Sequence, residues 1–176
     1  MPHMILLPDS DSAVSSDWIL GGSSAEGTVH DSLDDNNGDN SFVACDDHLE
    51  TMIIGYANPS VAEGDITSID SVRFLSSGRS TDRRNASSVI ISFQTPSGFA
   101  ETCSYDAHAS SYEAISGIVR EEKPSSGGDW IYPDIEALEM ICTKFGAQNI
   151  QLSYLALRVD YTEAVTTNAT FFGANF

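Results

Sequence analysis

Hydrophobic and polar side chains alternate along much of this chain, which is the pattern of strands that bury one face. The alternation is clearest near the C-terminus, where Leu155, Leu157, Val159 and Tyr161 would share one face of a strand. Other short runs rich in β-branched and aromatic residues lie between turn-forming residues. We expect these runs to be strands: 49–56, 66–75, 88–94, 99–105, 112–120 and 150–161.

One segment has the spacing of an amphipathic helix instead. Its apolar residues are three or four positions apart: Ile135, Leu138, Ile141, Cys142 and Phe145. A proline and two acidic residues stand near its start, where they suit the first turn and the helix dipole, and Gly146 can end it. The sequence therefore predicts one short α-helix over about 134–145.

Short strands separated by turns, with a single helix, predict an all-β fold, an antiparallel jelly-roll-like β-sandwich. The length of 176 residues suits one such domain, which we place at 17–162. Prolines, Asp and Ser around a small apolar patch indicate an extended N-terminal arm over 1–16. Residues 163–176 are small and polar apart from three phenylalanines, and we expect a C-terminal tail.

The charge of the chain excludes some partners. It has 26 acidic and 8 basic residues, a formal net charge of −18, and its first Lys or Arg is Arg73. Without a basic stripe to neutralise phosphates, we expect no nucleic-acid partner, and an anionic membrane is disfavoured for the same reason. The acidity has two explanations. It keeps the protein soluble, or it marks a surface that faces away from DNA or meets a basic partner or divalent cations.

Metal sites and cofactors are not expected. The three cysteines, Cys45, Cys103 and Cys142, have no CxxC spacing, so we expect buried reduced thiols and not a zinc site or a disulfide framework. The loop 34–39 is rich in Asp and Asn, but an EF-hand register would put Leu33 at its first position and Ala44 at its twelfth. A solvated turn and a less regular oxygen-ligand site both remain open there.

The sequence predicts no enzyme and no catalytic residues. Asp47-His48 and Asp106 with His108 place carboxylates near imidazoles, but nearness in sequence does not make a catalytic dyad. The chain has no GxSxG, HExxH, P-loop or GxGxxG motif. The adjacent carboxylates of Glu121-Glu122 do not suit a glycosidase pair, because adjacent loop residues seldom face each other across a substrate.

Three groups of residues are candidates for binding a partner. They are Ile5, Leu6 and Leu7 in the arm, Arg79, Arg83 and Arg84 in a predicted hairpin loop, and Phe171, Phe172 and Phe176 in the tail. Exposed apolar side chains on polar arms are a liability for a monomer, which favours docking on another subunit. The arginines would meet an acidic neighbour or the chain's own acidic loops, or they would simply belong to a solvated loop. Trp18 and Trp130 fit either a core or a surface that stacks on a sugar.

Several motifs occur in a particular order along the chain. They are Asp17-Trp18, an Asp-rich loop, Asn58-Pro59-Ser60-Val61, Gly64-Asp65-Ile66, Val72-Arg73, Trp130, Pro133-Asp134-Ile135-Glu136-Ala137-Leu138-Glu139 and Val159-Asp160-Tyr161-Thr162. The order resembles a jelly-roll-like domain of structural proteins in tailed bacteriophages, which include head decoration and minor tail components. The resemblance implies a fold and a virion setting, and it carries over no catalytic residues.

Two functions compete. The first is a capsid decoration (cement) protein that binds the outside of a phage head and stabilises it. Its partners would be the major capsid protein or other virion subunits, and it would form homo-oligomers, with a trimer expected. It would be assembled in the bacterial cytoplasm and located in the virion. The second is a tail or fibre accessory protein whose β-sandwich binds glycans.

Deletion of residues 163–176 separates the two hypotheses. A decoration protein should stay folded but lose attachment in a capsid co-sedimentation assay, because the tail would dock on another subunit. A glycan-binding module should tolerate the deletion. Undiminished attachment to capsids would contradict the proposed role of the tail.

Overall fold

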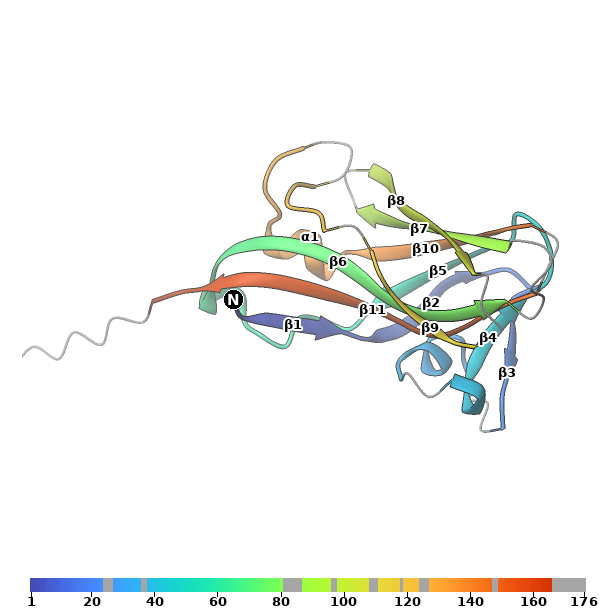
Figure 1. The fold of residues 1–176 in the computed structure, drawn as a ribbon. Coiled ribbons are helices and arrows are strands. Elements are labelled where there is room, and N and C mark those ends of the chain that lie inside the picture. Colours follow the sequence, from blue (N-terminus) through green and yellow to red (C-terminus); the bar gives the residue numbers. More distant parts are fainter. Residues whose placement is uncertain are drawn as a thin grey trace, which may run out of the picture.

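The computed structural model of the protein describes residues 1–23, 27–35, 38–80, 87–95, 98–107, 111–117, 119–123, 127–146 and 149–165. In these residues the chain forms an antiparallel β-sandwich with very little helix, which confirms the predicted all-β fold class (Figure 1). The strands are β1 (His3–Leu6), β2 (Pro8–Val14), β3 (Ile19–Gly21), β4 (Phe42–Cys45), β5 (Thr51–Tyr56), β6 (Ile66–Ser80), β7 (Ser87–Thr95), β8 (Gly98–Ala107), β9 (Glu113–Ser116), β10 (Glu139–Phe145) and β11 (Ile150–Glu163). The helical segments are η1 (Asp31–Leu33), η2 (Gly38–Asn40), η3 (Glu63–Asp65) and α1 (Tyr132–Glu136).

The two sheets are built from strands that are distant in sequence. Sheet A has the order β3-β4-β11-β6-β9, and β1 also pairs with β11; sheet B has the order β2-β5-β10-β7-β8. The chain crosses repeatedly from one sheet to the other, as in a jelly roll. Because each sheet has one apolar face, the two faces close on a single core between the layers.

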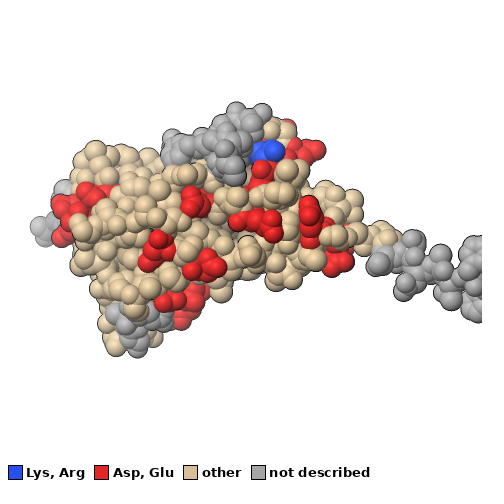
Figure 2. Space-filling view, turned by 180° about the vertical axis from the view of Figure 1, so that it is seen from behind, with Lys and Arg blue, Asp and Glu red and all other residues tan. Residues whose placement is uncertain are grey.

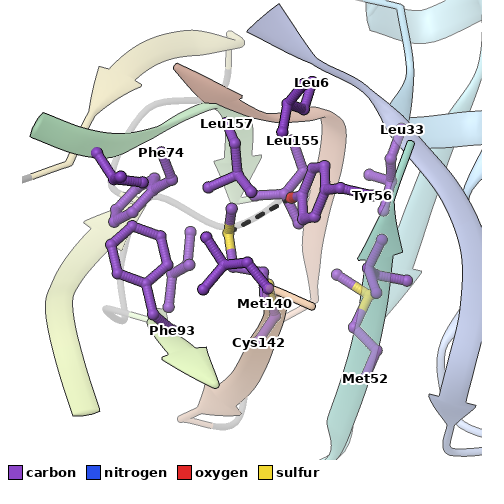
Figure 3. Packing of buried hydrophobic residues seen from close by; sticks show 14 of the residues in the cluster. Leu6, Leu33, Met52, Tyr56, Phe74, Phe93, Met140, Cys142, Leu155 and Leu157 are labelled. Carbon is purple, nitrogen blue, oxygen red and sulfur yellow. Dashed lines mark hydrogen bonds between the residues drawn. The ribbon is translucent and has the colours of Figure 1, made fainter. Parts of the chain in front are cut away.

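The longest pairing, between β6 and β11, sets the inner face of sheet A. Its register puts Leu157 opposite Phe74 and Val159 opposite Val72, and all four side chains are fully buried. They meet the inner residues of sheet B, such as Phe93 and Met140 (Figure 3). The Tyr56 hydroxyl donates to the Met140 sulfur at 3.6 Å, so the polar tip of this buried tyrosine has a partner.

The predicted N-terminal arm is instead two strands. β1 pairs with β11 in sheet A, and β2 pairs with β5 in sheet B. Met4 and Leu6 point into the core, whereas Ile5 and Leu7 are each 38% exposed. The alternation is too short to stand out in the sequence, but burying Met4 and Leu6 removes apolar area from water and fixes the segment.

The predicted helix over 134–145 is also wrong for most of its length. α1 has five residues, and Glu139–Phe145 forms β10 in the middle of sheet B, paired with β5 on one side and β7 on the other. Met140 and Cys142 face the core while Ile141 lies on the other face and is still only 8% exposed. A central strand with apolar residues on both faces imitates helical spacing.

No helix in the described part of the chain is long and apolar enough to cross a bilayer.

The segment between β3 and β4 is pinned to β2 by one carboxylate. Asp11 accepts hydrogen bonds from the backbone N–H groups of Val29 (3.1 Å) and His30 (2.8 Å). These bonds hold η1 against the sandwich, where Leu33 is completely buried.

Among the described residues, no group of His, Cys, Asp or Glu is placed to hold a metal ion.

A lysine is buried at the far end of β10. Lys144 has no exposed surface, and its ammonium group donates to the carbonyl oxygens of Asp46 (2.7 Å) and Gly146 (2.8 Å). Burial lowers the pKa of Lys144 below its ordinary value, although the nearby groups of Cys45, Asp46 and Asp47 oppose this shift. The two carbonyl contacts tie the β4–β5 loop to the end of β10.

The burial of β1 predicts different costs for two neighbouring truncations. Leu6→Ala should lower the free energy of unfolding by about 2–5 kcal/mol, because it leaves a cavity in the core. Ile5→Ala, the matched control on the exposed face, should cost less than about 1 kcal/mol. Urea unfolding of both variants measures this, and equal small effects would mean that β1 does not belong to the core.

Candidate functional site

A groove opens where β6 begins, between this strand and residues 121–122 and 129–132. It consists of two adjoining hollows of about 590 Å³ and about 200 Å³. Both hollows share one set of lining residues: Thr67, Ser68, Ile69, Trp130 and Ile131. Because both contain these five residues, we treat the two hollows as a single groove.

The wall of the groove is a segment that continues the edge of sheet A beyond β9. Arg120 bridges to Val72, and Trp130 bridges to Ile69, both antiparallel to β6. The Trp130 indole N–H donates to the Arg120 carbonyl oxygen at 3.1 Å, and its ring meets Phe93 edge to face at 6.2 Å. Trp130 is only 3% exposed, so it anchors this wall and presents little surface to a ligand.

The first turn of α1 holds Ile131 out into the groove. The Ile131 backbone N–H donates to the Asp134 carboxylate at 3.1 Å, and Lys123 pairs with the same oxygen at 3.2 Å. The Ile131 side chain is 52% exposed. Beside it, Tyr132 donates its hydroxyl to the Val61 carbonyl oxygen at 2.8 Å, which fixes the orientation of its ring.

Hydroxyl and carboxylate groups line the β6 side of the groove. Asp70 accepts hydrogen bonds from the hydroxyls of Ser68 (2.8 Å) and Thr162 (2.9 Å). Thr67 donates to the Glu163 carbonyl oxygen at 3.3 Å. The remaining acidic lining residues are exposed: Glu63, Glu121, Glu122 and Asp129. Among the lining residues of the two hollows there is no Lys or Arg.

This composition determines what the groove can bind. Carboxylates accept hydrogen bonds from hydroxyl or amino groups, and hydroxyls both donate and accept. Apolar surface from Ile131 adds contacts that do not depend on charge. Phosphates and other polyanions would be repelled, which agrees with the acidic surface seen from behind the molecule, where basic side chains are nearly absent (Figure 2).

The structure describes four of the residues predicted to bind a partner: Ile5, Leu6, Leu7 and Arg79. Ile5 and Leu7 are exposed, but Leu6 is 2% exposed and belongs to the core, so it is not available for docking. Arg79 lies in β6 and not in a loop; its guanidinium stacks 4.5 Å over the Tyr112 ring, and its Nε donates to Gln151 at 2.7 Å. The other predicted residues lie outside the described part of the chain: Arg83, Arg84, Phe171, Phe172 and Phe176.

The idea that a tryptophan stacks on a sugar is corrected by the burial of both tryptophans. Trp18 is 4% exposed and Trp130 is 3% exposed, and both belong to the core. Sequence reasoning also missed the groove itself. Its one signal was the order Trp130-Ile131-Tyr132-Pro133, in which a buried aromatic precedes a helix start and leaves the next apolar residue in the open.

Next to the groove, the outer face of sheet A carries a buried carboxylate. Asp160 accepts from Arg158 Nε (3.0 Å) and Nη2 (2.7 Å) and from the Ser71 hydroxyl (3.2 Å). Burial alone would raise its pKa, but the hydrogen bonds and charge of Arg158, with help from Ser71 and Arg73, lower the pKa of Asp160 below its ordinary value. The carboxylate is thus charged and held in place.

No protein-family model and no curated protein sequence matches this chain. Among solved structures, it is similar to the CBM36-1 domain of a multidomain xylanase from the hindgut metagenome of Trinervitermes trinervoides (10% identity, TM-score 0.44, 93% of this chain and 100% of that chain). It is also similar to CBM29_1, a family 29 carbohydrate-binding module from Piromyces equi (9% identity, TM-score 0.42, 90% and 91%). A third is the xylan-binding module CBM15 (12% identity, TM-score 0.45, 93% and 100%). At these identities and TM-scores, the ligand of this chain has to be inferred from its own residues.

The lowered pKa of Asp160 predicts a pH dependence. A carboxylate with a lowered pKa in the folded state stabilises the fold above its unfolded value, near 3.8, and loses this contribution as the pH falls through its folded pKa. Asp160→Asn should therefore destabilise the protein at neutral pH, and the difference from wild type should shrink below about pH 4. Urea unfolding across the acid range measures this. A difference that does not change with pH would contradict the assignment.

Proposed function

We propose that this chain is a non-catalytic β-sandwich module that binds carbohydrate in the groove beside the start of β6. The observation that supports it is the groove's composition: hydroxyl and carboxylate groups beside exposed apolar surface, with no basic residue lining it. The three similar structures are themselves carbohydrate- or xylan-binding modules, and the proposal for this chain is made from its own groove.

The β6 side of the groove suits the hydroxyl groups of a sugar. Asp70 is held by Ser68 and Thr162, so its carboxylate is already oriented before a ligand arrives. A charged acceptor forms stronger hydrogen bonds than a neutral one. Because Asp70 stands on a strand, its side chain loses little conformational entropy when a ligand binds. Sugar hydroxyls can donate to the remaining lone pairs of Asp70 and to the neighbouring hydroxyl oxygens.

The opposite side supplies the apolar contact. Ile131 is half exposed at the edge of both hollows, and Tyr132 lines the smaller one. The hydroxyl groups of a sugar ring point outward around its edge, which leaves its C–H faces apolar. These faces can pack on the side chains of Ile131 and Tyr132. This contact takes the place of the tryptophan stacking that the sequence suggested.

The exposed carboxylates argue for binding without catalysis. A glycosidase acid needs a dry pocket that keeps it protonated, and its partner carboxylate must stand across the scissile bond. Glu121, Glu122 and Asp129 are all exposed on the rim of the larger hollow. The proposal is therefore a module that holds a glycan and leaves its bonds intact.

The capsid-decoration hypothesis stays a prediction from the sequence. Neither the comparisons nor the described residues indicate a phage origin. Of its proposed docking residues, Leu6 is in the core, and the tail phenylalanines lie outside the described residues. The surface that the structure does describe supports the groove better than this hypothesis.

Loss of the Asp70 carboxylate should weaken glycan binding. Affinity electrophoresis through gels that contain xylan, β-glucan, mannan or hydroxyethylcellulose would identify a ligand and its dissociation constant. Asp70→Ala should raise that constant roughly tenfold or more, since hydrogen bonds to a charged group contribute about 1.5–3 kcal/mol. Asp70→Asn, which keeps the shape and loses the charge, should fall between Asp70→Ala and wild type.

The matched control is Asp46→Ala. Asp46 is an exposed carboxylate in the β4–β5 loop, at the opposite end of the sandwich, and only its backbone oxygen contacts Lys144. This variant should bind as wild type does. The proposal would be contradicted if no gel retarded wild type, or if Asp46→Ala and Asp70→Ala lost equal affinity. Release of reducing sugars from a bound polysaccharide would contradict the non-catalytic part of the proposal.

A further inference from the structure

Two arginines face each other on the outer face of sheet A. The register of β6 with β11 puts Arg73 opposite Arg158, between inward-facing rows that hold Val72 and Phe74. Because side chains alternate along a strand, both arginines point away from the core. Like charges directly opposite one another in a sheet are destabilising, so this arrangement has a cost that some anion must offset.

Asp160 lies close enough to both arginines for each to lower its pKa, but it forms an ion pair only with Arg158. Arg158 uses Nε and Nη2 to hold Asp160, which leaves its Nη1 without a partner among the described residues. Arg73 forms no hydrogen bond or ion pair with any described residue, and its Nε is buried without a partner. The residue as a whole is half-buried, and its terminal nitrogens are not among the buried unpaired atoms, so they reach solvent.

A shortage of acidic residues does not explain the unpaired Arg73. The chain has 26 acidic residues for 8 basic ones, yet none of the described acids forms an ion pair with Arg73. Other cations of the chain are occupied: Lys123 by Asp134, and Arg79 by Tyr112 and Gln151. Arg73 is thus a guanidinium on an outer face with open donors.

We propose that Arg73 and Arg158 form a subsite for the carboxylate of a uronic acid, on a glycan that also occupies the groove. This inference rests on the proposed function. The terminal nitrogens of Arg73 and the open Nη1 of Arg158 would hold the carboxylate, since planar guanidinium groups match its two oxygens. Ile5, paired with Arg158 and partly exposed, adds apolar surface beside them.

The subsite lies farther along β6 than the groove. Asp70 in the groove and Arg73 are three residues apart on β6, which corresponds to about 10 Å along the strand. One glycan chain can therefore place a neutral sugar at Asp70 and a uronic acid at Arg73. An acidic peptide suits this surface less well, because its further carboxylates would meet the acidic groove.

Two matched pairs of polysaccharides test the subsite: arabinoxylan with glucuronoxylan, and β-glucan with a sparsely C6-oxidised form in which most sugars stay neutral. Wild type should bind the acidic member of a pair about tenfold more tightly, as expected for one charge-assisted contact. Arg73→Gln should abolish this preference without weakening binding to the neutral member. Arg73→Lys should keep part of it, because the charge remains while the planar fork is lost. The matched control, Arg79→Gln, removes an equal charge from the same strand and should keep the preference.

A second readout separates this inference from the proposed function. In an NMR titration of the arginine Nε–H signals, D-glucuronate should shift the Arg73 signal to saturation and D-glucose should not. If no polysaccharide binds, the proposed function fails, and this titration still decides whether the subsite exists. Three results would overturn the subsite. They are no shift of the Arg73 signal, equal affinity of wild type for both members of a pair, and a loss of the preference in Arg79→Gln equal to that in Arg73→Gln. Poly-glutamate is the competitor that tests the occupant. If it displaces glucuronate from Arg73 at concentrations as low as glucuronoxylan does, the occupant of the subsite is not a glycan.

Discussion

The pairing of β6 with β11 is the constraint on which the rest of the structure depends. Its register runs from Ile150 opposite Ser80 to Glu163 opposite Ile66 and contains three shifts. A slip of one residue would turn the buried row of sheet A to solvent, so the apolar core enforces this register. The same register decides what stands on the outer face, because inward and outward rows alternate.

One of these shifts shapes the groove directly. Asp160 pairs with Ser71 and Tyr161 with Ile69, which leaves Asp70 as an extra residue on β6. Bulges of this kind re-aim a side chain without ending the strand. The freed Asp70 turns to Ser68 and Thr162 and becomes the oriented carboxylate of the groove. Core packing and the candidate site are thus consequences of a single pairing.

The few basic residues of this acidic chain show how its charge is used. Lys144 holds two backbone carbonyls inside the fold, Lys123 steadies the first turn of α1 through Asp134, and Arg158 holds Asp160. Each of these cations does structural work next to a carbonyl or a carboxylate. The acidic residues are left mostly on the surface and on the rim of the groove, and this charge would disfavour anions there.

Alternation of apolar and polar residues is enough to predict the fold class and the inner face of β11, because it reports directly which side of a strand is buried. The other features follow from contacts between segments that are distant in sequence. β10 was mistaken for a helix because a central strand is apolar on both faces, and β1 was mistaken for an arm because a four-residue strand carries too little pattern. The groove joins 66–70 with residues 121–122 and 129–132, which are far apart in sequence and meet through the bridge between Ile69 and Trp130. Alternation records that a side chain is buried, but it does not record which strand lies beside it, and the site depends on that pairing.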